Sequence, residues 1–302
     1  MNRAKKIRLV VPIIFILFLV SYARHKQENR HNNIVGMLPN RDMDEISGIA
    51  ASGINKNIYY IHNDSGDTSR FFAIYPTGEL RSTIYFNGDP KLKRFGVRDC
   101  EDIAVGPGPV KGISYVYMGD IGDNYSKRQY LTVYRMKERK EWANEGTYQT
   151  TAVPIHLKYP DHPKDAETLM IDPIEKLIYI VSKRQDSVTV YTTPLIYKPN
   201  DTVMLTKRCR LYFPGIKPFR WITAGDISKD GQQVLIKSYN KVYYWKREHN
   251  EPIWKTVQKP RKLLPYEEEK QGEGIGFTPD GKGYYTCSEG VYTPIYYYRI
   301  PE

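Results

Sequence analysis

Cysteine and histidine are scarce in this chain. The 302 residues include six histidines and three cysteines, Cys100, Cys209 and Cys287. Three scattered cysteines are too few for a disulfide framework in a domain of this size. One disulfide bridge or three buried free thiols are the alternatives. We favour free thiols, because Cys209 and Cys287 lie inside strand-like segments.

Familiar catalytic motifs are also missing. The sequence has no G-x-S-x-G, no H-E-x-x-H and no dinucleotide-binding fingerprint. The segment GPGPVKG at 106–112 lacks the closing G-K-S/T of a phosphate-binding loop. His62 is the one histidine expected near the site described below, and a lone histidine there is more often a packing residue than a base. These absences argue against a hydrolase with a catalytic triad.

Only one long apolar run is present, LVVPIIFILFLVSYA at 9–23. It is shorter than the roughly 20 residues of a spanning helix, it follows several basic residues, and it ends in the small-x-small pattern SYA. Residues 1–33 therefore predict a secretory signal peptide. An uncleaved anchor, with a membrane tether through 9–23, is the alternative, because Arg24 and Lys26 could extend the run by snorkelling. In both cases we expect the remaining chain to be secreted, periplasmic or associated with the cell envelope.

The positive charge does not indicate nucleic-acid binding. The formal net charge is +11 at pH 7, and residues 1–33 alone hold seven Lys/Arg against one Glu. The mild excess that remains for 34–302 contains no basic run interleaved with aromatic residues of the kind that RNA- and DNA-binding modules use. We therefore expect no nucleic-acid partner.

Tyrosine is abundant, at 26 residues against 9 phenylalanines, which favours β structure. A short polar head followed by an apolar run recurs along the chain. The heads are EISGIAAS (45–52), DCEDIAVGP (99–107), DAETLMIDP (165–173), WITAGDISKDG (221–231) and QGEGIGFTPDG (271–281). Aligning them forms one column, which holds Ser47, Glu101, Glu167, Thr223 and Glu273 at spacings of 54, 66, 56 and 50 residues. This period is typical of propeller blades.

The same order of short strands follows each head, with four strands in a complete unit. The last unit supplies three strands before the chain ends, whereas IVGMLP at 34–39 is strand-like and unassigned. We therefore predict an all-β fold: a single five-bladed β-propeller over 34–302, closed by this N-terminal strand as the outer strand of the last blade. Such closure removes an exposed sheet edge.

Two other folds are the alternatives. A six-bladed ring would need a blade hidden in the long second unit, where KERKEWANEGTYQT at 137–150 is more typical of a charged loop. A β sandwich without repeats is the second alternative. In the third unit we expect MLTKRCRLYF at 204–213 to form a single outer strand.

In a propeller, the heads and the loops between the second and third strands meet at one rim. We call this rim the mouth. The column glutamates Glu101, Glu167 and Glu273 should lie near its axis. The polar side chains expected around them are Glu45, Asn63, Asp64, Asp99, Asp120, Asp123, Asn124, Asp165, Glu289, Lys183, Arg184 and Lys237.

Converging carboxylates repel one another unless a cation or basic side chains neutralise them. A cluster rich in oxygen and poor in His and Cys suits Ca²⁺ better than zinc or copper. Glu101, Glu167 and Glu273 are therefore the candidate metal ligands. The candidate ligand-binding residues are Asn63, Asp64, Asp120, Asp123, Asn124, Arg184 and Glu289.

A structural role is the alternative for each of these residues. The column glutamates could accept backbone hydrogen bonds and lock blade to blade, and Asp, Asn and Gly are favoured in tight turns for backbone reasons. Lys183 and Lys237 end apolar strands, where snorkelling explains a lysine. Asp102 has the opposite strand parity from the column, so we expect it at the blade interface.

The heads EISGIA, CEDIAVGP, AETLMIDP and GEGIGFTPDG, with YMGDIGDN, YIVSKR and SEG, resemble a family of uncharacterised bacterial secreted propellers. The resemblance covers roughly residues 43–300. That family is similar, more distantly, to the phytase-like and gluconolactonase-like calcium propellers. The kinship implies a divalent metal at the mouth and hydrolysis of ester, lactone or phosphoester bonds, although fold kinship alone does not carry a function. Ser47 and Thr223 depart from a uniform acidic ring.

Two functions of different classes follow. The first is an extracytoplasmic propeller that binds a divalent cation, calcium by preference, and a small anionic or polyhydroxy ligand. As an enzyme it would be a metal-dependent hydrolase, with Glu101, Glu167 or Glu273 as base and Lys183 or Lys237 steadying the anion. The second is a non-catalytic scaffold for proteins or carbohydrates, with docking on 137–150 or on the Tyr-rich 292–299. We expect a monomer.

Overall fold

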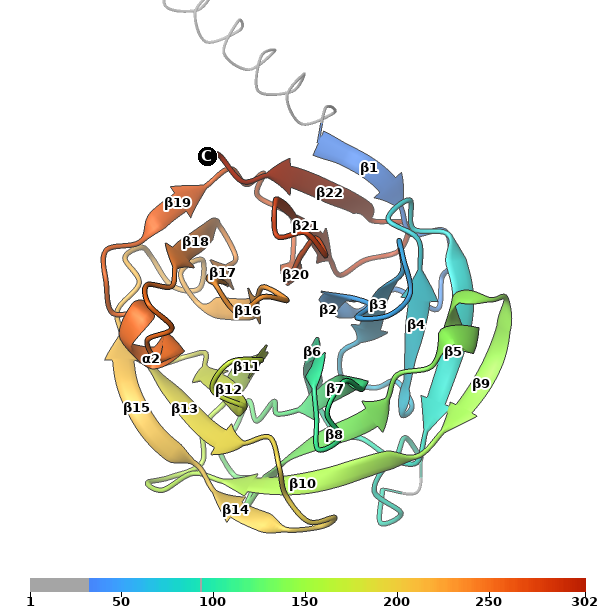
Figure 1. The fold of residues 1–302 in the computed structure, drawn as a ribbon, viewed down its shortest axis with the longest axis horizontal. Helices are drawn as coiled ribbons and strands as arrows, with labels where there is room; N and C mark the ends of the chain where they lie inside the picture. Colours follow the sequence, from blue (N-terminus) through green and yellow to red (C-terminus); the bar gives the residue numbers. More distant parts are fainter. Residues whose placement is uncertain (1–32, 93) are drawn as a thin grey trace, which may run out of the picture.

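Five sheets stand in a ring around a common axis (Figure 1). The computed structural model describes residues 33–92 and 94–302, so the leader predicted at 1–33 lies outside the described residues except for its last residue. In the described part of the chain, no helix combines the length and apolar character needed to cross a membrane.

Each blade begins with an innermost strand that contacts the innermost strands of both neighbouring blades. The innermost strands are β2 (Ile46–Ala51), β6 (Cys100–Pro107), β11 (Ala166–Asp172), β16 (Ile222–Ile227) and β20 (Gly272–Phe277). The second strands are β3 (Tyr59–Asn63), β7 (Ser114–Asp120), β12 (Leu177–Ser182), β17 (Gln233–Ser238) and β21 (Gly283–Ser288).

The outer half of each blade continues the antiparallel meander. The third strands are β4 (Arg70–Ile74), β8 (Leu131–Lys137), β13 (Val188–Pro194), β18 (Lys241–Lys246) and β22 (Pro294–Arg299). The fourth strands are β5 (Leu80–Phe86), β10 (Ala152–Lys158), β15 (Thr206–Leu211), β19 (Lys262–Leu264) and, in the fifth blade, β1 (Ile34–Met37). A short helix, α2 (Ile253–Thr256), precedes β19.

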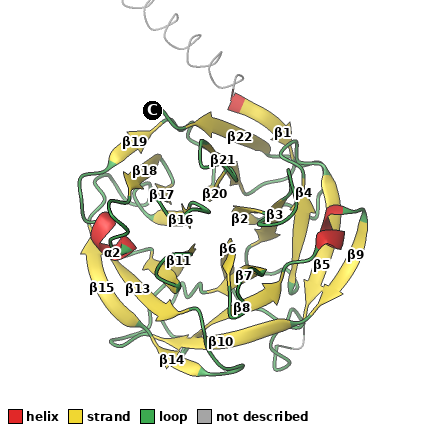
Figure 2. Ribbon diagram, viewed as in Figure 1, coloured by secondary structure: helices red, strands yellow, loops and turns green. Residues whose placement is uncertain are grey.

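The two ends of the described chain close the ring together, as predicted. β1 pairs antiparallel with β22, with Ile34 opposite Tyr296 and Met37 opposite Pro294. Figure 2 shows β1 beside β22 at the outer edge of the ring. The described residues form five sheets in total, so the six-bladed alternative is wrong.

The segment 137–150 differs from the charged loop that the sequence predicts. It contains the 3-10 helix η1 (Lys140–Ala143) and the strand β9 (Gly146–Thr150), which pairs parallel with β5 of the first blade. Trp142 in η1 is fully buried and contacts Phe71, with ring centroids 5.5 Å apart. The second unit is long because this segment straps blade two onto blade one. A buried tryptophan anchor explains why the charged residues beside it do not form a free loop.

The predicted single strand at 204–213 is also divided. β14 (Thr202–Met204) pairs parallel with β10 of the second blade, and β15 pairs with β13 of the third blade. Leu205 between them is buried, so the chain turns inward there. Blade three is thereby strapped onto blade two.

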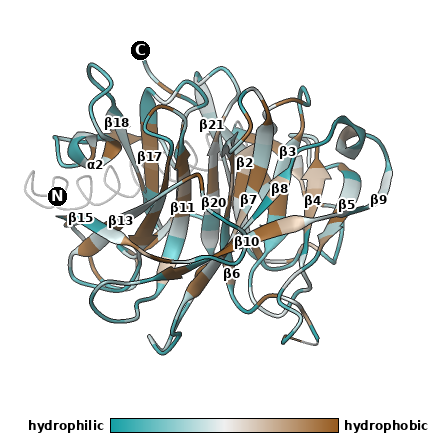
Figure 3. Ribbon diagram, turned by 60° about the horizontal axis from the view of Figure 1, so that its bottom comes forward, coloured by the Kyte–Doolittle hydropathy of each residue, from teal (hydrophilic) through white to brown (hydrophobic). Residues whose placement is uncertain are grey.

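The hydrophobic core lies between the blades. Five clusters of buried apolar side chains fill the interfaces between neighbouring sheets. Phe71, Ile103 and Val116, for example, meet between blades one and two. Fully burying one such large side chain stabilises the fold by about 1.5–3 kcal/mol. Figure 3 shows the hydrophobic strands in the body of the ring and hydrophilic loops at its ends.

All three cysteines are free and buried, which confirms the prediction. Burial raises the pKa of Cys209 to about 11, and it also raises the pKa of Cys100 and Cys287. The thiols are therefore protonated and unreactive at neutral pH.

Candidate functional site

A β-bulge occurs at the same place in all five innermost strands. The pairing of each innermost strand with its second strand skips one residue near the head. The skipped residues are Ser47, Glu101, Glu167, Thr223 and Glu273, the members of the aligned column. A bulge leaves a residue unpaired and re-aims its side chain. The repeated column is therefore a backbone feature as well as a sequence feature.

The two hydroxyl members of the column join neighbouring blades. Ser47 Oγ donates a hydrogen bond to the Glu101 carbonyl at 2.8 Å, and Thr223 Oγ1 donates to the Gly272 carbonyl at 3.3 Å. These two residues have the locking role that is the structural alternative for the column. The three glutamates do not make this contact, and their carboxylates belong to a different arrangement.

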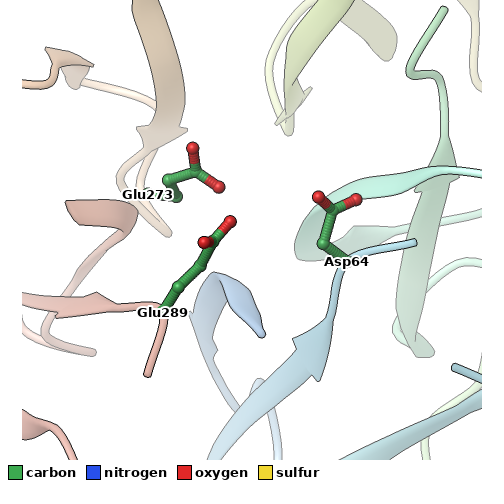
Figure 4. A group of neighbouring side chains, drawn as sticks. All are labelled: Asp64, Glu273 and Glu289. Atoms are coloured by element: carbon green, nitrogen blue, oxygen red, sulfur yellow. The ribbon is translucent and has the colours of Figure 1, made fainter. Parts of the chain in front are cut away.

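Seven carboxylates form a continuous group at the mouth, which we call the acid belt. In each of three overlapping sets, one oxygen per residue lies within 4.8 Å of the others. The sets are Asp64, Glu273 and Glu289; Asp64, Asp99 and Glu101; and Glu101, Asp165 and Glu167. Figure 4 shows the first set, with Asp64 facing Glu273 and Glu289 across a common space. Asp64 and Glu101 link the sets, so the belt draws carboxylates from blades five, one, two and three.

Burial and mutual repulsion hold protons on the belt. Burial first, and the neighbouring Asp99 and Glu273 next, raise the pKa of Asp64 to about 7. Burial and Asp165 raise the pKa of Asp99 to about 6. Burial and the hydrogen bond with Glu273 raise the pKa of Glu289 to about 9. At neutral pH the belt therefore retains protons that a bound cation would displace.

Burial also raises the pKa values of the two most deeply buried glutamates, Glu101 and Glu167. Burial, then Glu167, raises the pKa of Glu101 well above its usual range. Burial also raises the pKa of Glu167, although Lys183 opposes that effect. Glu101 and Glu167 are each 2% exposed, so water does not screen their repulsion.

One lysine and one arginine neutralise part of the belt. Lys183 Nζ donates a hydrogen bond to Glu167 Oε1 and lies 3.9 Å from Glu273 Oε1. Burial acts to lower the pKa of Lys183, but Glu167 and Glu273 outweigh it, so the pKa is raised and the ammonium stays charged. Arg184 pairs with Asp165 and donates to Asn124. Two cations face seven carboxylates, and the protons held by groups such as Glu289 and Asp64 make up part of the difference.

Two belt oxygens have no partner among the described residues. Glu167 Oε2 and Asp64 Oδ1 are both buried, and neither accepts a hydrogen bond there. A buried polar atom without a partner costs free energy unless water, an ion or a ligand satisfies it. These atoms indicate where the belt can accept a ligand.

Three other predicted ligand-binding residues are occupied within the protein. Asp120 forms an ion pair with Arg128 at 2.7 Å. Asp123 accepts the backbone N–H groups of Lys127 and Arg128, which shapes the loop after β7. Asn63 donates to the Asp42 carbonyl and to Asp67 Oδ2. These residues support the mouth, whereas the exposed Asn124 remains beside Arg184 at its surface.

Lys237 differs from Lys183. Its side chain is fully buried, and Nζ donates to the carbonyl of Gly272, the residue before Glu273. Burial lowers the pKa of Lys237 to about 8, an effect that Glu269 and Glu273 oppose. Its ammonium donates hydrogen bonds to the backbone carbonyls of Gly272 and Ser238, so Lys237 braces the head of blade five.

Two further sequence expectations concern the inner wall. Asp102 Oδ2 accepts the N–H of Leu169 in the next blade at 2.9 Å, as predicted for a blade-interface residue. His62 is buried and its Nδ1 contacts the Asn63 carbonyl at 2.8 Å. Burial lowers the pKa of His62 to about 4, which fits a neutral packing residue.

Sequence reasoning missed the aromatic side of the mouth. Tyr239, after β17, donates to Glu273 Oε1 at 2.6 Å, and its ring lies under Lys183. Trp221, at the head of blade four, lies under the Arg184 guanidinium, 4.9 Å from the ring centre. Blade four is the one blade without a carboxylate in the acid belt. The sequence signal was present in WITAGD and SYNK. There Trp221 stands at the head position that Asp99 and Asp165 occupy in other blades, and Tyr239 stands at the loop position of Asp64 and Glu289.

Comparisons with known proteins bear on the fold alone. No known family model matches the sequence, and no curated protein matches it. Similar solved structures include a Dos1 propeller, with 13% identity over 85% of this chain and 71% of that chain at a TM-score of 0.40. Another is a chain of a nidogen/laminin complex, with 11% identity over 82% of this chain and 73% of that chain at a TM-score of 0.44. The resemblance to phytase-like and gluconolactonase-like propellers stays a prediction. The strand order itself establishes a five-bladed β-propeller, a fold that supports a binding or interaction scaffold.

Proposed function

We propose that the acid belt binds a divalent cation, calcium by preference, and that the bound cation holds a small anionic or polyhydroxy ligand at the mouth. The observation that carries this proposal is the linkage of seven carboxylates from four blades into sets whose oxygens lie within 4.8 Å of one another. The buried, unpartnered Glu167 Oε2 and Asp64 Oδ1 support it independently. Repulsion among these groups is the driving force for taking up a cation.

The donor set favours a hard cation. All seven side chains offer carboxylate oxygens, and Ca²⁺ takes six to eight oxygen ligands in flexible geometry. Glu101, Glu167 and Glu273 would supply the deep ligands, and Asp64 and Glu289 the outer ones. Cation binding would also release protons from Asp64, Asp99 and Glu289, so affinity should rise between about pH 6 and 9.

The ligand class follows from what borders the belt. Arg184 keeps a third of its side chain exposed (33%), and Asn124 is exposed beside it. Guanidinium and amide donors suit carboxylate, phosphate or hydroxyl groups. The half-buried Trp221 ring beside them suits the apolar face of a sugar or a similar polyhydroxy compound.

Hydrolysis is the second candidate function, and the pKa values of two carboxylates favour it. Asp64, at about 7, and Asp99, at about 6, titrate near neutral pH. A general base works best when its pKa lies near the operating pH. A cation at the belt would polarise an ester, lactone or phosphoester, and Asp99, which is not among the ligands named above, would take the proton of the attacking water.

Thermal unfolding with calcium and with EDTA tests the cation. We expect calcium to raise the Tm of the full-length chain, and a Glu167→Gln, Glu273→Gln double variant to lose most of the shift. The matched control is Glu145→Gln, whose side chain is 80% exposed on the strap. It removes a charge without touching the belt and should keep the full shift.

The outcomes separate the candidates. If calcium did not change the Tm of the parent chain, the proposal of a cation site would be wrong. If the double variant kept the full change in Tm, the site would lie elsewhere. Turnover of aryl esters, lactones or phosphoesters that needs calcium would establish the hydrolase. Calcium binding without turnover of any of them would leave a binding protein.

A further inference from the structure

A second cavity lies at the far ends of the innermost strands. Its volume is about 330 Å³, within the range of roughly 300–1,000 Å³ that small-molecule sites occupy. Every blade contributes at least one apolar residue from the far half of its innermost strand. Among these residues are Ala51, Val105, Ile171, Ile227 and Phe277. Four residues separate Ser47 in the column from Ala51, about 13 Å of extended chain, so this distal pocket is separate from the acid belt.

The wall of the distal pocket is apolar in effect. Three of its hydroxyl groups are used within the protein: Ser52 donates to Glu138, Ser228 Oγ donates to Asp230 at 2.5 Å, and Thr278 Oγ1 donates to Asp280 at 2.6 Å. Ile54, with 41% of its surface exposed, stands at the opening. The apolar part of a ligand would therefore contact aliphatic and aromatic carbon atoms of the wall. The hydroxyl groups of Ser52, Ser228 and Thr278 would keep their hydrogen bonds.

One carboxylate lines the pocket, and it too is occupied. Asp226 Oδ2 accepts the backbone N–H of Phe277 at 2.8 Å. Burial, despite that hydrogen bond, raises the pKa of Asp226 to about 7. At neutral pH it carries about half a negative charge, and below neutral pH it carries less. The pocket therefore lacks the dense acidity of the mouth.

Two lysines at the pocket form no ion pair with any carboxylate of the described chain. Lys176 and Lys229 are exposed and come from blades three and four. Lys229 Nζ donates to the Gly53 carbonyl at 3.0 Å, and Lys176 Nζ donates to the Pro173 carbonyl at 2.5 Å. Within the described chain neither forms an ion pair, since both hydrogen bonds end on backbone carbonyls. A neighbouring depression of about 560 Å³ shares Ile54 and Lys229 and adds Lys56 and Asp280. Asp280 accepts hydrogen bonds from Thr278 and the backbone of Lys282, so an anionic group has room beside the lysines.

We propose that the distal pocket binds a small amphiphilic anion, an aliphatic or aromatic carboxylic acid whose apolar body enters the cavity while its carboxylate pairs with Lys176 and Lys229. The apolar wall favours a ligand with an apolar chain or ring, and the ammonium groups that form no ion pair favour a negatively charged head group. A carboxylate at this place would replace two hydrogen bonds to neutral carbonyls with stronger charge-assisted ones. A cationic amphiphile of the same length would meet the lysines and be rejected.

Calorimetric titration of the full-length chain with decanoate tests the site. We expect binding of one decanoate per chain, no detectable binding of acetate, and at least about tenfold weaker binding of decyltrimethylammonium, since loss of a charge-assisted contact costs at least that much. Lys176→Gln with Lys229→Gln should weaken decanoate about tenfold. Ala51→Phe, which fills the cavity, should abolish it.

Matched controls keep the result interpretable. Lys158→Gln with Lys246→Gln removes the same charge from exposed positions on β10 and β18 and should leave decanoate affinity unchanged. The belt variant Glu167→Gln, Glu273→Gln should leave it unchanged as well. Equal binding of the cationic amphiphile, or equal decanoate affinity in the Lys176, Lys229 and Lys158, Lys246 variants, would overturn the proposal. Absence of decanoate binding by the parent chain would overturn it too.

Discussion

At the heads of the five innermost strands, seven carboxylates gather around the axis, whereas at their far ends the same strands present Ala51, Val105, Ile171, Ile227 and Phe277. The head end has Lys183 and Arg184 bound tightly to carboxylates. The far end has Lys176 and Lys229 on backbone carbonyls. The basic side chains of the head end are therefore paired with carboxylates, whereas the two lysines of the far end form no ion pair within the described chain.

The difference lies in the backbone. The heads carry the five bulges, which leave one residue per strand outside the regular pairing. Towards the far ends the pairing is regular, with Phe277 opposite Tyr284 and Ile227 opposite Val234. A regular strand packed between two blades carries mostly apolar residues, whereas the bulges of three blades free a position that holds a glutamate of the acid belt.

Removing Lys183 should have the largest effect on the head end. Lys183→Met leaves Glu167 and Glu273 without their buried cation, and breaking a buried pair costs about 3–5 kcal/mol. We expect the free energy of unfolding in EDTA, measured by urea denaturation, to fall by that amount. Calcium should restore more stability to this variant than to the parent chain.

The matched control is Lys176→Met at the other end of the axis. An exposed lysine that bonds to a carbonyl should change stability by no more than about 0.5 kcal/mol. If Lys183→Met were as stable as Lys176→Met in EDTA, the head end would not be electrostatically strained.

The stability of the metal-free chain should fall as pH rises. Asp64, Asp99 and Glu289 have folded pKa values of about 7, 6 and 9, against about 4 when unfolded. Between about pH 4 and each folded pKa the folded state holds more protons than the unfolded state. Its stability therefore declines from about pH 4 and levels off only as the pH passes 6, 7 and 9 for the three groups. After allowance for solvent screening, we expect a loss of about 2–4 kcal/mol between pH 5 and 9 in EDTA.

Calcium should flatten that profile, because it holds the belt in its ionised form. Chemical denaturation at several pH values, with EDTA and with calcium, measures both curves. If stability changed with pH in the same way in EDTA and in calcium, the titrating carboxylates would not be ligands of the cation.

Tyr239→Phe should have a smaller effect. It removes the hydrogen bond to Glu273 and should cost about 1.5–3 kcal/mol of stability, as for a hydrogen bond to a charged group. Calcium affinity should change with it, and decanoate affinity should not. Tyr292→Phe, at a side chain 49% exposed, is the matched control. If Tyr239→Phe changed the affinity for decanoate more than the affinity for calcium, the two ends would not be independent binding sites.

Asp226→Asn should have the smallest effect at low pH. An asparagine oxygen can still accept the Phe277 N–H, so stability at pH 5 should stay within about 1 kcal/mol of the parent. Above pH 7 the variant should be the more stable one, since burial raises the pKa of Asp226 and its ionisation destabilises the fold. Calcium should not alter this difference. A calcium-dependent difference would connect Asp226 to the mouth.

The fold could be predicted from periodicity because the blade interfaces require it. The heads, the four strands and the closure by 34–39 all follow from turns and apolar runs that repeat. The straps could not be predicted, because β9 and β14 pair parallel with strands of neighbouring blades, and a charged or short segment gives no signal of such long-range pairing. The one clue to the first strap was a tryptophan, Trp142, within an otherwise charged segment, and in the structure it is buried.

The candidate site could be predicted only as a neighbourhood. The column placed Glu101, Glu167 and Glu273 correctly among other carboxylates, and the loops added Asp64 and Glu289. Which polar residues are already occupied depends on side-chain partners that spacing does not show. Asp120 looks like Asp64 in sequence, but Arg128 pairs with it.

The most direct test is a crystal structure of the full-length chain grown with calcium, with anomalous data to identify the ion. The account predicts at least one calcium peak at the acid belt, with oxygens of Asp64, Glu101, Glu167, Glu273 or Glu289 at about 2.3–2.6 Å from it. A belt that holds only water in saturating calcium, with its carboxylates bonded to one another, would contradict the account.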